Sequence, residues 1–244
     1  MKVFRGLNNL PSFRNAVATM GSFDGVHSGH RELLRRVMDI AAGVDGESIV
    51  ITFDPHPRYV LGTGERMSLL TTLDEKLWLL EQIGINNVIV VPFTTEFSRT
   101  SPEDFIQQHI APLGLHTLVV GYNHRFGHKK EGDYDFLERS ADFKVQMVEQ
   151  QQVVGSKVSS TIVRQLLTQG LMTKAAKLLS HPYILACDID NKGYAINIDE
   201  HKLLPTSGEY DARIGDSIVR VSIDDNCSLS VKPIIKGRVI LEFE

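Results

Sequence analysis

Residues 20–30 read MGSFDGVHSGH and lie between two segments of different periodicity. The apolar run at 16–18 before them is short enough to be a buried strand, and residues 31–42 after them repeat apolar side chains at helical spacing. The stretch is therefore predicted to be a strand-to-helix turn. Such a turn offers unpaired amides and the positive end of the helix dipole to an anion, so a phosphate is the expected ligand.

The glycines and histidines of this stretch fit that ligand. Gly21, Gly25 and Gly29 let the backbone bend and approach a ligand closely. His27 and His30 are three residues apart at the start of the helix, so their side chains can point the same way and donate to a phosphoryl oxygen. Taken alone, however, a glycine-rich turn is a common connection and a single histidine is usually a surface residue.

The composition indicates a well-packed protein with small-molecule partners. The chain has 244 residues, 42% of them hydrophobic, which suffices for one large domain plus a smaller one. Its 26 basic and 30 acidic residues give a net charge of -4, so we expect no nucleic acid partner. No apolar run predicts a signal peptide or a membrane span. The oligomeric state stays open.

The two cysteines indicate a reducing compartment. Cys187 and Cys227 fit no metal or redox spacing and are expected to be small buried side chains, with a disulfide as the alternative. We therefore expect a cytoplasmic protein.

Strand and helix patterns alternate through the first two-thirds of the chain. Further strands are predicted at 49–51, 87–93, 117–121 and 144–148. One helix is predicted at 69–83, with Thr71 or Thr72 as its N-cap and Gly84 as its stop. Another is predicted within 97–113, where Ser101 is the N-cap and Pro102 the first helical residue. This alternation predicts an α/β fold with a doubly wound parallel sheet.

Two segments lie where ligands bind in such sheets, beyond the carboxyl ends of strands. The first is TFDPHP, residues 52–57, whose prolines taken alone could merely end a strand. The second is GYNHRFGHKKEGD, residues 121–133, which combines glycines, aromatic rings and basic side chains. A solvated charged loop is the alternative for the second segment.

A third segment, KVSSTIVRQLLTQG at 157–170, begins a helix. Ser159 and Ser160 are good caps, and Arg164 lies one turn inside, within reach of an anion at the helix start. By itself this is an ordinary, well-capped helix.

Together these motifs resemble the prokaryotic bifunctional riboflavin kinase/FAD synthetase family. The stretch at 20–30 resembles GxFDGVHxGH, which includes the HxGH signature of nucleotidyltransferases, while TFDPHP resembles TFxPHP and SSTIVR resembles SSTxxR. The resemblance covers residues 16–179 and implies a nucleotidyltransferase fold of the Rossmann type. It also implies an FMN adenylyltransferase that uses ATP and FMN with Mg²⁺, the ion bridging phosphates and needing few protein ligands. No metal-binding residue is therefore named.

The resemblance also implies residue roles. His27, His30 and Arg164 are the expected catalytic residues. The expected ATP and phosphate ligands are Gly21, Phe23, Gly25, Lys130, Ser159, Ser160 and Thr161. The expected flavin ligands are Phe53, Pro55, His56, Asn123 and Phe126. Asp24 is expected to stabilise the turn.

The loop at 121–133 departs from the family pattern GxDFxFGxxRxG. Asn123 stands where aspartate is common, His124 replaces phenylalanine, and Lys130 lies where arginine is frequent. An amide at 123 can still hydrogen-bond a flavin edge or a metal-bound water, but it cannot neutralise a cation.

From residue 182 the pattern changes to six short segments separated by turn residues, which predicts a small antiparallel β domain. We therefore expect an adenylyltransferase domain at 1–181 and a β domain at 182–244. LLPTSGEY at 203–210 resembles part of the riboflavin kinase module, but GYAIN at 193–197 lacks the Pro-Thr pair of the family's GFPTAN. The resemblance thus implies a truncated, kinase-inactive module.

Two other interpretations remain. A related HxGH nucleotidyltransferase could use another phosphate acceptor, although TFDPHP and the β domain argue against it. The chain could also be a flavin- or nucleotide-binding regulator, an idea motivated by the degenerate kinase module and by Asn123.

Overall fold

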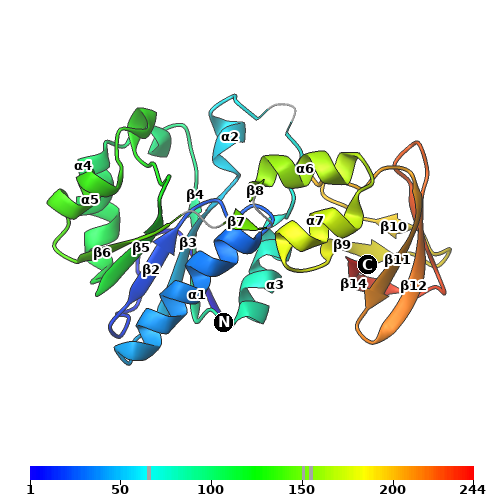
Figure 1. The fold of residues 1–244 in the computed structure, drawn as a ribbon, viewed down its shortest axis with the longest axis horizontal. Coiled ribbons are helices and arrows are strands. Elements are labelled where there is room, and N and C mark those ends of the chain that lie inside the picture. Colours follow the sequence, from blue (N-terminus) through cyan, green and yellow to red (C-terminus); the bar gives the residue numbers. More distant parts are fainter. Residues whose placement is uncertain (65–66, 150–151, 154–155) are drawn as a thin grey trace. The chain divides into compact units, whose positions relative to one another are not determined.

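The computed structural model describes residues 1–64, 67–149, 152–153 and 156–244 (Figure 1). Contacts divide the chain into two compact units that are both discontinuous in sequence. The first unit comprises Met1–Phe23, Gly29–Arg66 and Leu80–Gln151, and the second comprises Asp24–Ser28, Met67–Leu79 and Gln152–Glu244. The expected domain boundary after residue 181 stays a prediction.

The first unit contains a sheet of six strands, and the prediction that the sheet is parallel is confirmed (Figure 1). Its order is β1-β4-β3-β2-β5-β6, and every neighbouring pair is parallel. The strands are β1 (Lys2–Arg5), β2 (Val17–Met20), β3 (Ser48–Asp54), β4 (Asn87–Pro92), β5 (Thr117–Gly121) and β6 (Lys144–Val148).

The strand order places a topological switch point beside β2. From β2 the chain adds β3 and then β4 on one side, and it later adds β5 and β6 on the other. Loops that leave the carboxyl ends of β2 and β5 therefore run in opposite directions, which is where open α/β sheets bind ligands. Met20 and Gly121 are the last residues of these two strands.

Alternate residues of the strands face two apolar layers. Ala18 and Met20 join a buried cluster with Phe105, Ile110 and other side chains of one face. Helix α1 (Ser28–Gly43) covers the other face and buries Leu33, Leu34, Val37 and Ala41, as its periodicity predicted (Figure 1). The α-helices that follow α1 in the chain before β6 are α2 (Pro57–Val60), α3 (Leu73–Ile83), α4 (Pro102–Asp104) and α5 (Tyr134–Ser140).

Two predicted helices differ from the observed ones. Helix α3 begins at Leu73 rather than 69, because the Leu70 amide donates to Asp24 Oδ1 and Thr72 is the cap that accepts from the Glu75 amide. The predicted helix within 97–113 is interrupted. Its pieces are a 3₁₀ turn at Phe97–Arg99, α4, a π-helix at Phe105–Ile110 and a 3₁₀ turn at Ala111–Leu113. Ser101 caps α4 as expected, accepting from the Asp104 amide.

The second unit contains a six-stranded antiparallel sheet in the order β10-β9-β14-β11-β12-β13 (Figure 1). Its edge strands meet, because Tyr194 bridges to Ser230 and the Val231 amide donates to the Gly193 carbonyl oxygen at 2.8 Å. The strands are β9 (Tyr183–Ile189), β10 (Ala195–Ile196), β11 (Gly208–Ile214), β12 (Ser217–Ile223), β13 (Leu229–Lys232) and β14 (Gly237–Phe243). The sheet is therefore nearly a barrel, and the prediction of a small antiparallel β domain is confirmed.

Two helices share the core of this second sheet. Helices α6 (Ser160–Thr168) and α7 (Met172–Leu179) contribute Val163, Leu167 and Leu179 to the cluster that the sheet residues form. A short antiparallel ladder, β7 (Gln152–Val153) with β8 (Ser156–Lys157), precedes α6.

The cysteine prediction is half right, because Cys187 is buried whereas Cys227 lies exposed, and both thiols are free. Within the described ranges, none of the helices combines the length and the apolar composition that crossing a membrane requires.

Candidate active site

The turn at 21–27 follows β2 and leads into α1, as predicted. Phe23, Gly25 and Val26 adopt the left-handed conformation, with φ of 48°, 80° and 39°. A Cβ at Gly25 would lie 2.7 Å from the Leu70 side chain, so this position requires glycine for its conformation and for space. Gly21 and Gly29 are not among the glycines of positive φ in the described ranges.

Asp24 fixes this turn through contacts with other residues of the second unit. The carboxylate is buried, and its Oδ1 accepts from the amides of Leu70 at 2.9 Å and Thr71 at 3.1 Å. Its Oδ2 forms an ion pair with Arg164. The Gly25 amide donates to Thr71 Oγ1 at 3.0 Å. Asp24 therefore stabilises the turn, as expected, and its carboxylate oxygens are engaged by the protein.

The start of α6 meets the same turn. Ser160 Oγ donates to the Asp24 carbonyl oxygen at 2.9 Å, and Arg164 Nε donates to the Ser68 carbonyl oxygen at 2.7 Å. Ser159 caps the helix by accepting from the Ile162 amide, and Thr161 is exposed. The structure thus brings SSTIVR to the glycine-rich turn, and it shows Arg164 bound to protein oxygens.

The two histidines differ in their surroundings. His27 is only 8% exposed, and burial lowers its pKa from 6.5 to about 4, although Asp24 opposes this shift. At neutral pH its ring is uncharged and carries one N–H. His30 lies in the first turn of α1, and its ring packs edge-on against Phe23 with ring centroids 5.2 Å apart.

Aromatic side chains gather near the carboxyl ends of β3 and β4. Phe53 is half-buried and contacts Phe93, with ring centroids 5.5 Å apart, and Phe93 contacts Phe97 at 5.7 Å. Pro55 is exposed, whereas His56 caps α2 by accepting from the Arg58 amide.

Phe93 and Phe97 are not among the predicted site residues. Phe93 directly follows the end of β4, and Phe53 is the residue before the last of β3, so a position at the carboxyl end of a strand was the available signal for Phe93.

The loop after β5 is organised by Phe126. Its amide and carbonyl pair with Gly132, and a Cβ at Gly132 would lie 2.6 Å from the Phe126 ring. The ring is 8% exposed and lies within the apolar cluster of the first unit. The His124 ring stacks on it with centroids 5.8 Å apart, and burial lowers the pKa of His124 to about 4. Asn123 and Lys130 are exposed.

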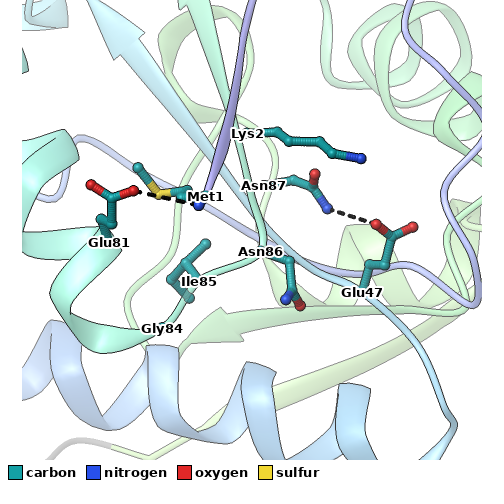
Figure 2. A pocket seen from close by; sticks show the side chains of 8 residues that line it. All are labelled: Met1, Lys2, Glu47, Glu81, Gly84, Ile85, Asn86 and Asn87. Carbon is teal, nitrogen blue, oxygen red and sulfur yellow. Dashed lines mark hydrogen bonds and ion pairs between the residues drawn. The ribbon is translucent and has the colours of Figure 1, made fainter.

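A cavity of about 400 Å³ lies at the opposite ends of the strands, because Lys2 and Asn87 begin β1 and β4. Figure 2 shows Asn87 donating to Glu47, and Glu81 in contact with the Met1 amine. Its lining contains none of the predicted site residues. The described residues also contain no group of three or more His, Cys, Asp or Glu arranged for a metal ion.

Comparison with known proteins identifies the family. A profile described as FAD synthetase matches residues 10–162. The chain is 34% identical over 209 residues to a bifunctional riboflavin kinase/FMN adenylyltransferase of Listeria monocytogenes, covering 80% of this chain and 67% of that protein. It is 33% identical over 208 residues to an FAD synthetase of the same species, covering 83% of this chain and 82% of that protein.

A solved structure shares the fold. The crystal structure of a macrolide-efflux protein from Streptococcus pneumoniae superposes with a TM-score of 0.85, covers 100% of this chain and 98% of its own, and is 21% identical. At that identity the likeness concerns the fold alone. The matched family profile, the identity to the two Listeria proteins and the motifs at 20–30 and 159–164 agree, and the chain belongs to the FAD synthetase family.

Proposed function

We propose that this FAD synthetase transfers the adenylyl group of MgATP to FMN through the turn at 21–30 and the start of α6. A phosphate oxygen of FMN attacks the α-phosphorus of ATP, a new P–O bond forms, and the bond to the β-phosphate oxygen breaks to release pyrophosphate. The reaction requires no protein nucleophile, so the protein contributes position and charge stabilisation.

One observation carries the phosphate part of the proposal. Ser160 Oγ donates to the Asp24 carbonyl oxygen, so the turn that precedes α1 and the first residue of α6 are held against each other inside one unit. Two motifs more than 130 residues apart thereby share a site. Amides at a helix start stabilise phosphate oxygens, and the hydroxyl groups there add donors.

The protonation state of His27 argues against an acid role. At pH 7 its imidazole is neutral and has no imidazolium proton to release, and its ring already takes part in a backbone hydrogen bond that it would exchange for one to a phosphate oxygen. An adenylyl transfer needs no such proton, because the FMN phosphate attacks as an anion and pyrophosphate leaves as an anion. We assign His27 and His30 to the transferring phosphate.

The role of Arg164 follows from its contacts. Its guanidinium binds Asp24 and the Ser68 carbonyl oxygen, so it holds the phosphate-binding turn in place. A direct contact with the polyphosphate, as the resemblance implied, would use the donors that remain on the same guanidinium.

Magnesium enters as MgATP. Both carboxylate oxygens of Asp24 are engaged by protein donors, so this residue is not a ligand for the ion. We assign the coordination of Mg²⁺ to phosphate oxygens and water, which is the usual arrangement for this ion at nucleotide sites.

The flavin side rests on the aromatic cluster. Phe53 with Phe93 and Phe97 offers ring surface beyond the carboxyl ends of β3 and β4. Flat rings of this kind pack against an isoalloxazine ring. Asn123 is exposed and supplies an amide for the flavin edge, whereas the buried Phe126 supports the loop from within.

We also propose that the β domain has lost riboflavin kinase activity. Asn197 is the residue of GYAIN that matches the asparagine of the family motif. Its side-chain amide donates to Asp188 at 2.9 Å, so it is already used within the sheet. The strand that contains part of the motif, β10, has only two residues.

Product analysis tests these proposals. The protein is incubated with MgATP and either FMN or riboflavin, and the flavins are separated by chromatography. We expect FAD from FMN and no product from riboflavin. FMN formed from riboflavin would contradict the loss of the kinase, and tight flavin binding without any product would favour a regulator.

A further inference from the structure

His181 contacts the phosphate-binding turn, although no motif includes it. It follows α7 by two residues and lies in the same unit as the turn. Its Nε2 lies 3.0 Å from the Gly25 carbonyl oxygen, and its Nδ1 lies 2.6 Å from the Pro182 carbonyl oxygen. Both distances are those of hydrogen bonds.

The chemistry of these two partners determines how many protons the His181 ring carries. A carbonyl oxygen only accepts, so each ring nitrogen must donate to keep its bond. A neutral imidazole carries one N–H, and only the imidazolium carries two. The two bonds together therefore require a positively charged ring.

We propose that His181 is a positioning residue for adenylyl transfer, held as an imidazolium that fixes the Gly25 carbonyl and places a positive charge behind the phosphate-binding turn. Thr71 Oγ1 accepts from the Gly25 amide, so His181 and Thr71 hold both polar groups of this left-handed residue. The proposal rests on the adenylyl transfer proposed above.

The buried carboxylates of this unit are engaged by other cations. Asp24 is paired with Arg164, and Glu75 is paired with Lys202. Burial lowers the pKa of His27, and the His181 charge lowers it further, so His27 is neutral at pH 7. The other titratable side chains of α7 and β9 are Lys174 and Lys177 on α7, and Tyr183, Cys187 and Asp188 on β9, of which Tyr183 and Cys187 are buried.

NMR tests the charge without any substrate. Long-range ¹H–¹⁵N spectra of the histidine rings distinguish an imidazolium from either neutral tautomer, and the His181→Gln variant assigns the signals. At pH 7 we expect both nitrogens of His181 to be protonated. A neutral tautomer at pH 7 would overturn the proposal. This measurement stands even if the protein forms no FAD, a result that would contradict the proposed function instead.

Kinetics tests the positioning role. We expect His181→Gln to lower kcat/KM for MgATP roughly tenfold at pH 7, as the loss of one hydrogen bond to a charged group does elsewhere. We also expect kcat/KM of the unmodified protein to fall once the ring loses its proton at alkaline pH. His181→Arg keeps a permanent charge and several donors, so that variant should retain activity without this alkaline fall.

His201→Gln is the matched control, because the His201 side chain is 53% exposed and lies outside the turn. A His181→Gln variant with unchanged kcat/KM, or a His181→Arg variant with the same alkaline fall, would contradict the positioning role. If His181→Gln does not fold, the His181→Arg variant assigns the histidine signals in its place, and those spectra and the pH profile of that variant still decide.

Discussion

Arg164 forms a buried ion pair with Asp24, a residue 140 positions earlier in the chain. The Asp24 side chain is 4% exposed and that of Arg164 is 16% exposed, so little water screens the pair. Arg164 also donates to the Ser68 carbonyl oxygen, and Asp24 accepts from Leu70 and Thr71. The pair thus connects the turn after β2, the segment before α3 and helix α6.

Removing either charge should destabilise the protein and weaken adenylyl transfer together. Asp24→Asn leaves an uncompensated guanidinium and Arg164→Met leaves an uncompensated carboxylate, so we expect a loss of about 3 kcal/mol in the free energy of unfolding for each. Urea unfolding measures this loss. A variant as stable as the unmodified protein would contradict the role of the pair.

The double variant separates two roles of Arg164. If Arg164 acts through Asp24, the two substitutions lower kcat/KM for MgATP by similar factors and their combination adds little. If Arg164 instead binds the polyphosphate independently, the two effects multiply. We expect the first result, because residues that share one interaction are not additive.

A second buried ion pair stabilises the same unit. Lys202 and Glu75 side chains are fully buried, and Lys202 Nζ donates to Glu75 at 2.7 Å and to the carbonyl oxygens of Leu70 and Ile184. Glu75 accepts from the Ala186 amide at 2.7 Å. The pair therefore links strand β9 to the segment at 70–71, whose amides bind the Asp24 carboxylate.

Lys202→Met and Glu75→Gln should each cost about 3–5 kcal/mol, because each leaves a buried charge unpaired. The double variant should cost less than the sum, since it removes both charges while the introduced glutamine side chain keeps an acceptor for Ala186. Fluorescence of Trp78, the single tryptophan, follows unfolding in urea. Asp211→Asn is the control, because its ion pair with Arg220 is exposed, and that variant should leave the free energy of unfolding nearly unchanged. Strictly additive losses at Lys202 and Glu75 would contradict the coupling.

The partly buried His124 should make the first unit sensitive to acid. Burial lowers its pKa from 6.5 to about 4, so between these values the unfolded chain binds a proton that the folded chain does not. The stabilisation is complete above pH 6.5 and is lost as the pH falls towards 4. His27 changes in the same direction and is present in both proteins of the comparison below.

His124→Phe keeps a ring against Phe126 and binds no proton. Relative to the unmodified protein, this variant should gain stability as the pH falls, by roughly 2–3 kcal/mol near pH 4.5. Urea unfolding at pH 7, 5.5 and 4.5 measures the difference. His201→Phe, at an exposed position, should show no such trend. Parallel pH curves for His124→Phe and the unmodified protein would contradict the assignment.

Short apolar runs between turn residues made most strands predictable. The runs at 117–121 and 144–148 became β5 and β6 with the same bounds. Strand β1 was missed, because three of its four residues are exposed at the edge of the sheet and their pattern carries no buried face.

The partners of the turn could not be predicted from local pattern. Asp24 was expected to stabilise the turn, yet its partners lie 46, 47 and 140 residues away. Thr71 or Thr72 was the expected helix cap; Thr72 is that cap, and the contact of Thr71 with Gly25 was not foreseen. Such contacts depend on the tertiary fold, and the same is true of His181, which lies 156 residues from Gly25.

His30 offers the most direct test of the phosphate site. Its ring lies in the first turn of α1, where a donor can follow charge that develops on the transferring phosphate. His30→Ala removes that donor and keeps a residue that favours the helix, so the fold should persist. We expect FAD formation from FMN and MgATP to fall by about 10²-fold or more, with little change in melting temperature. His201→Ala is the matched control and should keep its rate. If His30→Ala forms FAD at a near-normal rate, His30 takes no part in the transfer.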